Sequence, residues 1–218
     1  MCRDKALIIL NGDYNSSKKE FEDILAGESI SKIIAVDGGT DILKNFSVKP
    51  DIIIGDLDSI SLETKEYYSS IGVEIKKYPV EKDQTDSEIA VDYCSEMGIK
   101  SIIITAALGG RIDQEIANIN LLEYIKNKNI DAKIIDNNIE ISIIDDKKIF
   151  KYKKGYRLSL LAQTEVAAGL SISGCKYNLN SKDLLRYKTR GISNLILEDR
   201  AEVEIEDGLL ICILENID

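Results

Sequence analysis

The sequence predicts an α/β protein, in which an N-terminal doubly wound, Rossmann-like domain with a mostly parallel sheet precedes a C-terminal antiparallel β-sandwich domain. In the first half, short runs of Ile and Val alternate with amphipathic helical patterns, as in βαβ units. In the second half, polar and apolar residues alternate, and Gly punctuates them. The 218 residues suffice for two domains. We expect these to span residues 1–136 and 137–218, with a linker at residues 136–138.

Five strands are expected in the first domain. Four are continuous β-branched runs, which indicates strands buried on both faces of a parallel sheet. These are residues 6–10, 33–36, 52–54 and 102–105. Residues 73–78 alternate more, and we expect that strand nearer the sheet edge.

Three helices are expected between these strands. A Ser or Thr followed three positions later by Glu forms a capping box and marks a helix start. Such boxes open the helices expected at residues 17–25 and 86–97. The third helix is expected from about residue 114 to 126, with Ile116 among its inward-facing side chains.

The second domain is expected to contain antiparallel strands. Residues 148–160 alternate between polar and apolar side chains. Asp207-Gly208 separates two β-rich runs, so residues 201–214 are predicted to form a hairpin.

Composition excludes several classes of function. The formal net charge of -10 disfavours nucleic-acid and anionic-membrane partners. No apolar run approaches the roughly 20 residues that a bilayer span requires, and the N-terminus does not resemble a signal peptide. The four cysteines form no CxxC pair, which argues against a zinc site and a disulfide framework and favours reduced thiols in the cytoplasm. The chain has no histidine, so catalysis would depend on carboxylates, Arg, Lys, hydroxyls and metal.

Acidic motifs follow two of the predicted strands. Asp37 comes after residues 33–36, and Asp56 and Asp58 come after residues 52–54. In a doubly wound fold, ligands bind at the carboxyl ends of the strands. Crowded carboxylates raise one another's pKa, and Mg²⁺, which prefers carboxylate oxygens, would offset their repulsion. For Asp37 alone, ordinary turn chemistry is an equally good explanation.

Two further motifs stand at predicted helix starts. Helix capping explains Thr85, but it does not explain Asp83 and Asp86 beside Lys82. For this segment alone, an ordinary helix start and a functional site are equally good explanations. Gly109-Gly110-Arg111 precedes the third helix, where backbone N–H groups and a guanidinium would hold phosphate. A tight turn is the alternative for the two glycines, and neither a Walker A sequence nor GxGxxG is present.

In their order and separation, these motifs resemble the thiamine pyrophosphokinase family over nearly the whole chain. The motifs that carry the resemblance are Asp37-Gly38-Gly39, Gly55-Asp56-Leu57-Asp58-Ser59-Ile60, Lys82-Asp83-Gln84-Thr85-Asp86, Gly109-Gly110-Arg111-Ile112-Asp113-Gln114, Gly174-Cys175-Lys176-Tyr177-Asn178-Leu179 and Gly191-Ile192-Ser193-Asn194. Bacterial members commonly have Asp-His where this chain has Asp113-Gln114, and Gln also occurs there in the family.

The resemblance implies transfer of pyrophosphate from ATP to the hydroxyethyl group of thiamine, with Mg²⁺ and release of AMP, by a homodimer with active sites at the subunit interface. It implies that Asp56, Asp58 and Asp86 hold the metal and the ATP phosphates. The other residues expected to line the catalytic cleft are Asp37, Asp83, Arg111 and Asp113. The residues expected to bind ATP or thiamine are Gly38, Gly39, Lys82, Thr85, Gly109, Gly110, Arg111, Gln114, Ser193 and Asn194, the last two at the pyrimidine of thiamine.

Some alternatives stay open. Asp83 and Asp113 are the two candidates for the group that accepts the proton of the acceptor hydroxyl. The same aspartates would also serve a metal-dependent phosphohydrolase or a pyrophosphokinase acting on another alcohol, such as a pterin. A non-catalytic nucleotide sensor is a further possibility. Release of AMP that depends on thiamine distinguishes the proposed enzyme from all three.

Overall fold

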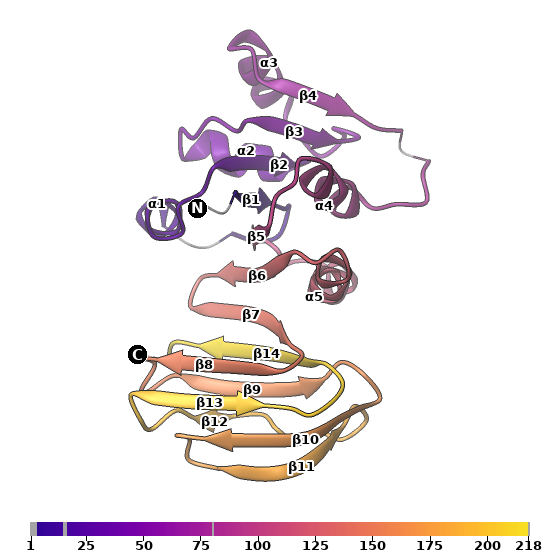
Figure 1. Cartoon of the computed structure of the whole chain (residues 1–218). Coiled ribbons are helices and arrows are strands. Elements are labelled where there is room, and N and C mark those ends of the chain that lie inside the picture. Colours follow the sequence, from indigo (N-terminus) through magenta and orange to yellow (C-terminus); the bar gives the residue numbers. More distant parts are fainter. Residues whose placement is uncertain (1–3, 15–16, 80, 218) are drawn as a thin grey trace. The chain divides into compact units, whose positions relative to one another are not determined.

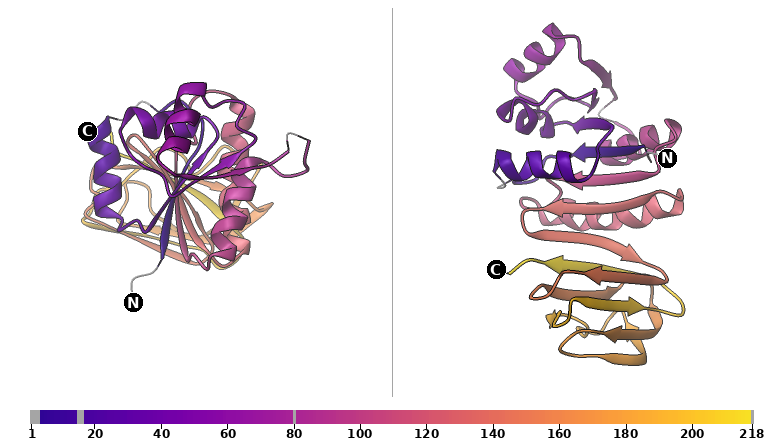
Figure 2. Two further views of the ribbon diagram at one scale, coloured as in Figure 1. Left: turned by 90° about the horizontal axis from the view of Figure 1, so that it is seen from above. Right: turned by 60° about the vertical axis from the view of Figure 1, so that its left-hand side comes forward.

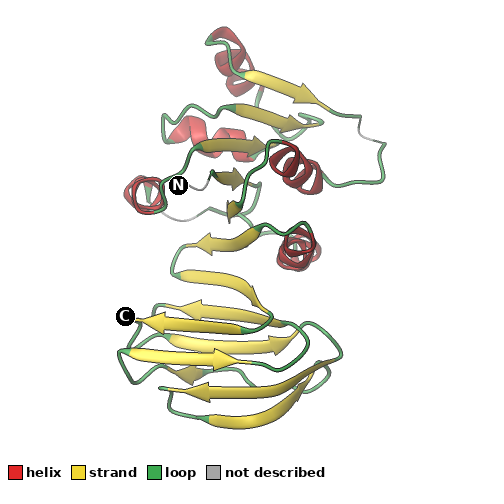
Figure 3. Ribbon diagram, in the orientation of Figure 1, coloured by secondary structure: helices red, strands yellow, loops and turns green. Residues whose placement is uncertain are grey.

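The computed structural model describes residues 4–14, 17–79 and 81–217 (Figure 1). The chain forms two compact units, Met1–Asn137 (unit 1) and Asn138–Asp218 (unit 2). Figure 3 shows that the described helices all belong to unit 1, whereas unit 2 consists of strands and loops. Among the described helices, none is both long enough and apolar enough to cross a bilayer.

The strands of unit 1 are all paired in parallel, in the order β6-β5-β1-β2-β3-β4. Their bounds are β1 Lys5–Ile9, β2 Lys32–Val36, β3 Ile52–Gly55, β4 Glu74–Lys77, β5 Ser101–Thr105 and β6 Asp131–Asp136. The five predicted strands are confirmed, and the alternating strand β4 lies at the edge. Strand β6 was not expected, because polar residues interrupt its apolar run, and the linker expected at residues 136–138 is wrong at Asp136. Asp136 instead ends this strand and is buried.

The helices of unit 1 cover both faces of its sheet, as expected for a doubly wound fold (Figure 2). Their bounds are α1 Lys18–Gly27, α2 Gly39–Asn45, α3 Leu62–Ser70, α4 Asp86–Glu96 and α5 Ile112–Asn127. Phe21 of α1, Leu43 of α2 and Tyr68 of α3 pack in one core with Leu7 of β1 and Ile53 of β3. Side chains alternate between the faces of a strand, so the neighbouring isoleucines point to the opposite face. There α4 contacts β2 and β3, α5 contacts β6, and the two helices contact each other.

The predicted capping boxes are confirmed at the starts of α1 and α4, where the Ser17 and Thr85 side chains accept from backbone N–H groups. Helix α5 begins two residues earlier than expected, and Ile116 is 55% exposed, so the prediction that it faces inward is wrong. The buried face of α5 lies further along the helix, at Leu121, Leu122 and Ile125. Helices α2 and α3 were not predicted individually because they are short.

Unit 2 is a sandwich of two antiparallel sheets, which confirms the predicted class of fold. One sheet has the order β12-β9-β14-β7, and the other has the order β11-β10-β13-β8. The strand bounds are β7 Ile139–Ile144, β8 Lys147–Lys151, β9 Arg157–Ala162, β10 Val166–Ser173, β11 Leu179–Leu185, β12 Asn194–Leu195, β13 Arg200–Glu204 and β14 Leu210–Glu215. Leu160 and Cys212 from the first sheet and Leu170 and Val203 from the second belong to one buried core.

The predicted hairpin over residues 201–214 is wrong, although both of its strands exist. Strand β13 pairs with β8 and β10, whereas β14 pairs with β7 and β9 in the other sheet. The Asp207-Gly208 turn therefore carries the chain between the two sheets. Gly208 has a φ of 93°, and the Ala168 N–H donates to the Asp207 carbonyl oxygen. A positive φ at Gly fits the turn, but the sequence does not reveal which sheet each strand joins.

Candidate active site

A cleft lies at the carboxyl edge of the unit 1 sheet, where the strand order changes direction. Strands β2, β3 and β4 follow on one side of β1, whereas β5 and β6 lie on its other side. Such a switch point is where doubly wound proteins bind their ligands. A cleft of about 450 Å³ opens there. Its polar lining residues are Asn11, Asp37, Asp56, Asp58, Ser59, Thr85, Asp86, Ser87, Arg111, Gln114, Glu115 and Asn118.

Glycines allow the loops around this cleft to approach one another closely. A Cβ on Gly39 would overlap the carbonyl oxygen of Ile9, and one on Gly38 would overlap the side chain of Asn11. A Cβ on Gly55 would overlap the carboxylate of Asp37, and Gly55 also has a φ of 148°. The predicted ligand residues Gly38 and Gly39 thus shape the cleft, because they bring the end of β2 against the end of β1.

Asp37 lies in the cleft with a left-handed backbone and a partly buried carboxylate. Its φ is 44°, a left-handed conformation, and its Oδ1 accepts a hydrogen bond of 3.2 Å from the Leu57 N–H. Burial is the main cause that raises the pKa of Asp37 from 3.8 to about 7, and the negative charge of Asp86 is the next cause. The Leu57 hydrogen bond opposes this rise only in part.

Asp56 and Asp58 interact with each other across a turn in which Leu57 adopts a left-handed conformation with a φ of 69°. The Asp58 N–H donates to Asp56 Oδ1 over 3.1 Å. A side-chain hydrogen bond with Asp56, followed by the charge of Asp56, raises the pKa of Asp58. Asp86 completes the acidic group, and Lys82 on the preceding segment lies beside it, with Nζ 2.9 Å from Asp86 Oδ1. Three separate segments therefore bring aspartates into one cleft, Glu115 on α5 adds a further carboxylate, and Lys82 offsets part of the negative charge.

The described residues, 4–14, 17–79 and 81–217, contain no group of three or more Asp, Glu, Cys or His side chains arranged to hold a metal ion by themselves. Mg²⁺ commonly keeps several waters and uses one or two protein carboxylates together with substrate phosphates. Burial and then the charge of Asp86 raise the pKa of Asp37, and Asp56 raises the pKa of Asp58, so a positive charge nearby would stabilise both of these carboxylates in their ionised form. The donor set therefore fits a metal that a phosphorylated ligand brings with it.

The glycine loop after β5 supplies the other side of the cleft. Gly109 and Gly110 have φ values of 73° and 118°, so both adopt backbone conformations that favour Gly. Arg111 lines the cleft and donates to Asp113 twice, from Nε over 3.1 Å and from a terminal nitrogen over 2.5 Å. The hydrogen bond from Arg111 lowers the pKa of Asp113, which makes this carboxylate a poor proton acceptor.

The predicted residues differ in how closely they approach the cleft. Asp37, Asp56, Asp58, Thr85, Asp86, Gly109, Arg111 and Gln114 line it. Asp83 and Asp113 are exposed and do not line the cleft. Lys82 does not line it either, but forms an ion pair with Asp86, which does. Asn11, Gly12 and Asn118 also line the cleft, although the sequence did not predict them. Asn11 and Gly12 directly follow the strand predicted at residues 6–10. The position at a strand end that identified Asp37 therefore identifies them as well.

Unit 2 contains a separate pocket of about 400 Å³ beside the predicted residues Ser193 and Asn194. Asn194 lines this pocket and is buried, and its side chain accepts from the Tyr177 N–H (2.9 Å) and donates to the Tyr177 carbonyl oxygen (2.8 Å). Ser193 is exposed, and its N–H donates to Ser159 Oγ over 3.0 Å. Asn194 therefore fixes the backbone at Tyr177, whereas Ser193 is exposed and lies outside the residues that line the pocket.

Fold and cleft together define an α/β protein of the class that binds phosphorylated ligands at a sheet switch point. Comparison with known proteins specifies the class further. Residues 21–134 match the family model "Thiamin pyrophosphokinase, catalytic domain", and residues 140–210 match "Thiamin pyrophosphokinase, vitamin B1 binding domain". The chain belongs to the thiamine pyrophosphokinase family.

Individual relatives agree with this assignment. The thiamine pyrophosphokinase of Bacillus subtilis is 31% identical over 182 residues, which cover 83% of this chain and 85% of that protein. A crystal structure of thiamine pyrophosphokinase from Bacillus subtilis superposes with a TM-score of 0.86 at 26% identity and covers 99% of this chain and all of its own. A crystal structure from Geobacillus thermodenitrificans gives 0.81 at 26% identity, over 97% of each chain.

Replacing Asp37 with Asn should raise the unfolding temperature at about pH 8 and change it little at about pH 4. The folded pKa of about 7 exceeds the ordinary 3.8, so the folded state binds more protons between these values, and stability falls as the pH rises through them. Asn cannot ionise and removes that loss. Thermal unfolding in metal-free buffers measures the effect.

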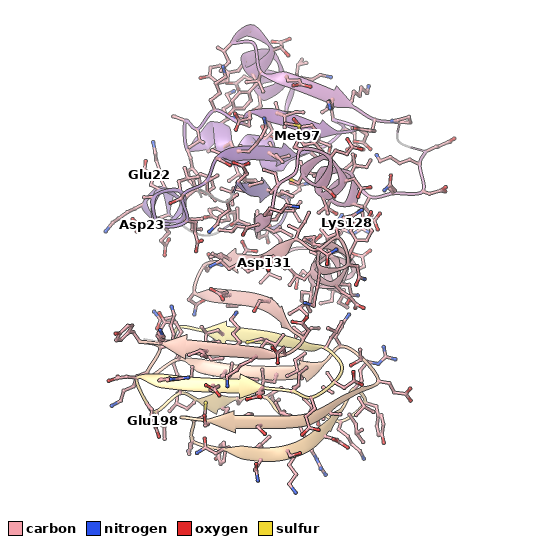
Figure 4. The ribbon with its side chains drawn as sticks, viewed as in Figure 1. Glu22, Asp23, Met97, Lys128, Asp131 and Glu198 are labelled. Atoms are coloured by element: carbon pink, nitrogen blue, oxygen red, sulfur yellow. The ribbon has the colours of Figure 1, made fainter. Side chains whose placement is uncertain are left out.

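The matched control is Asp23→Asn, because Asp23 is an exposed residue on α1 (Figure 4). This control should shift the unfolding temperature by a similar small amount at every pH. If Asp37→Asn behaved in the same way, the account of the Asp37 pKa would be wrong.

Proposed function

We propose that the protein transfers pyrophosphate from ATP to the hydroxyethyl group of thiamine and releases thiamine diphosphate and AMP. The observation that carries this proposal is the acidic cleft at the switch point of a chain that matches both domains of the thiamine pyrophosphokinase family. Transfer of this kind needs little covalent chemistry from the protein, because positioning and charge neutralisation lower most of the barrier. A site without histidine is therefore adequate.

Asp56, Asp58 and Asp86 are the residues that we propose would hold Mg²⁺ together with ATP. When bound, the ion would neutralise charge on the phosphates and on these carboxylates. The proximity of these carboxylates supports the assignment: besides burial, the charges of Asp86, Asp56 and Asp58 each raise the pKa of Asp37. Lys82 beside Asp86 would contribute further positive charge near the phosphates.

The loop at Gly109, Gly110 and Arg111 is proposed to bind the ATP phosphates from the other side. Its backbone precedes the 16-residue helix α5, whose N-terminal end favours an anion. The Arg111 guanidinium is 72% exposed in its side chain, so it can exchange Asp113 for a phosphate oxygen without leaving a buried charge unpaired. Gln114 and Asn118 lie beside it along the first turns of α5.

Unit 2 is proposed to bind thiamine, with Ser193 and Asn194 at its pyrimidine. The match of residues 140–210 to a vitamin B1 binding domain supports this role. We further propose that the protein is a cytoplasmic homodimer with active sites at the subunit interface, as the family resemblance implies. Sedimentation or light scattering would test the dimer, since a monomeric mass at micromolar concentration contradicts it.

The activity is tested by incubating the protein with ATP, Mg²⁺ and thiamine and measuring AMP. AMP that forms only when thiamine is present supports the proposal. Phosphate release without an acceptor would instead indicate a phosphohydrolase, and ATP binding without any product would indicate a sensor. A pterin alcohol in place of thiamine tests for the other acceptor.

Asp58→Ala should abolish thiamine-dependent AMP release while the unfolding temperature stays close to that of the wild type. Asp58 is exposed, so its loss opens no core cavity, but it removes one of the carboxylates proposed to hold the metal. The exposed Asp23→Ala on α1 serves as the control and should retain activity. Normal turnover by Asp58→Ala at saturating Mg²⁺ would refute the metal assignment.

Ser193→Ala should raise the KM for thiamine more than the KM for ATP. The exposed hydroxyl is free to meet a ligand, whereas the backbone bond to Ser159 persists in the variant. Loss of one hydrogen bond to a neutral group corresponds to a rise of about threefold to tenfold in the KM for thiamine. Steady-state kinetics with each substrate varied measures this, and Ser173→Ala, at an exposed serine on β10, is the control. A larger effect on ATP would place the acceptor elsewhere.

A further inference from the structure

Asp136, the last residue of β6, is a buried carboxylate that binds the loop after β5. Only 3% of its surface is exposed. Its Oδ1 accepts from the Ala106 N–H (2.6 Å) and from the Thr105 hydroxyl (3.0 Å). Its Oδ2 accepts from the N–H groups of Ala107 (2.8 Å) and Leu108 (2.9 Å). Three successive backbone N–H groups thus converge on one side chain.

Other contacts fix the carbonyl groups of the same loop. The Gly12 N–H donates to the Ala106 carbonyl oxygen over 2.7 Å, and the Asp13 N–H donates to that of Gly109 over 2.9 Å. The Asn118 side chain, on α5, donates to the Ala107 carbonyl oxygen over 2.9 Å. Ala106 itself adopts a left-handed conformation with a φ of 54°, which persists only where neighbouring contacts determine it. The loop is therefore held from β6, from the end of β1 and from α5.

Successive N–H groups that point to one centre form an anion-binding turn, the arrangement that many proteins use for phosphate. Here the chain's own carboxylate already occupies that turn. Ala107 of this turn lines the cleft, but its N–H donates to Asp136; Gly109 and Arg111, which follow the turn, also contribute to the lining. The contacts of Asp136 therefore fix the backbone from which Gly109, Gly110 and Arg111 continue.

We propose that Asp136 is a positioning residue for ATP: it occupies the anion-binding turn at Ala106–Leu108 and thereby places Gly109, Gly110 and Arg111 toward the phosphates. This inference rests on the proposed pyrophosphate transfer. Asp136 would not touch substrate itself, because it is buried behind the loop. Its effect should fall on ATP and spare thiamine, since the loop belongs to the cleft of unit 1.

The test compares Asp136→Asn with the wild type. An amide of the same shape presents one NH₂ group to the N–H donors, so the turn should loosen. We expect the KM for ATP to rise about tenfold to a hundredfold, because small displacements of positioning groups have effects of that size. The KM for thiamine should stay within about twofold. Hydrogen exchange of the peptide that covers residues 105–112 should accelerate.

Asp41→Asn is the matched control, because Asp41 is also a multiply bonded carboxylate of unit 1 but lies outside the cleft lining. It accepts from the Ser61 N–H, the Ser61 hydroxyl and the Thr64 hydroxyl. Its replacement should lower the unfolding temperature without changing the KM ratio of the two substrates. If both variants changed the kinetics alike, Asp136 would have a structural role only, and the proposal would be overturned.

Thr105→Val provides a milder variant that keeps Asp136 and its three backbone donors. It removes the hydroxyl that donates to Asp136 and to the Ile135 carbonyl oxygen (2.8 Å). It should raise the KM for ATP in the same direction by a smaller factor, and it decides the matter if Asp136→Asn does not fold. An unchanged KM for ATP in the folded variants would overturn the proposal.

The two proposals fail in different ways. A wild-type protein that makes no thiamine-dependent AMP contradicts the proposed function. In that case, calorimetric titration with Mg²⁺ and ATP, together with hydrogen exchange of residues 105–112, still tests Asp136. Weaker binding and faster exchange in Asp136→Asn would support the positioning role, and unchanged values in both would reject it.

Discussion

Negative charge crowded at the carboxyl edge of a parallel sheet is the constraint on which the rest of this structure depends. Asp37, Asp56, Asp58 and Asp86 reach one cleft from loops after β2 and β3 and from the start of α4. Burial, and then the repulsion of its acidic neighbours, raises the pKa of Asp37 to about 7. Such crowding is typical of functional sites and fits a positively charged or metal-bound ligand, which agrees with membership of the thiamine pyrophosphokinase family.

The backbone around the cleft is built to keep these charges close. Gly39 lets the end of β2 lie against β1, and Gly55 lets β3 pass against the Asp37 carboxylate. The loop after β5 is fixed by Asp136 and Asn118. Preorganised groups need not rearrange during reaction, so rigid loops suit a reaction in which positioning lowers most of the barrier.

Much of the fold and of the cleft could be predicted, because both follow from local patterns. Continuous Ile and Val runs identified four of the parallel strands, and an alternating run identified the edge strand β4. The position of acidic residues at strand ends identified Asp37, Asp56 and Asp58. The sequence could not reveal that β13 and β14 join different sheets, since an Asp-Gly turn serves a hairpin and a crossing equally well. Asp136 was missed for a similar reason: its partners are backbone N–H groups 28 to 30 positions earlier.

The central claim is tested most directly by carboxyl ¹³C NMR of the aspartates, titrated without metal and again with Mg²⁺ and a non-hydrolysable ATP analogue. The account predicts that Asp37 titrates near pH 7 in the metal-free protein. It predicts that the pKa of Asp37 falls when the ligand neutralises its acidic neighbours. Titration of Asp37 at the ordinary value near 3.8, unchanged by Mg²⁺ and nucleotide, would contradict the claim that these carboxylates share one metal-binding cleft.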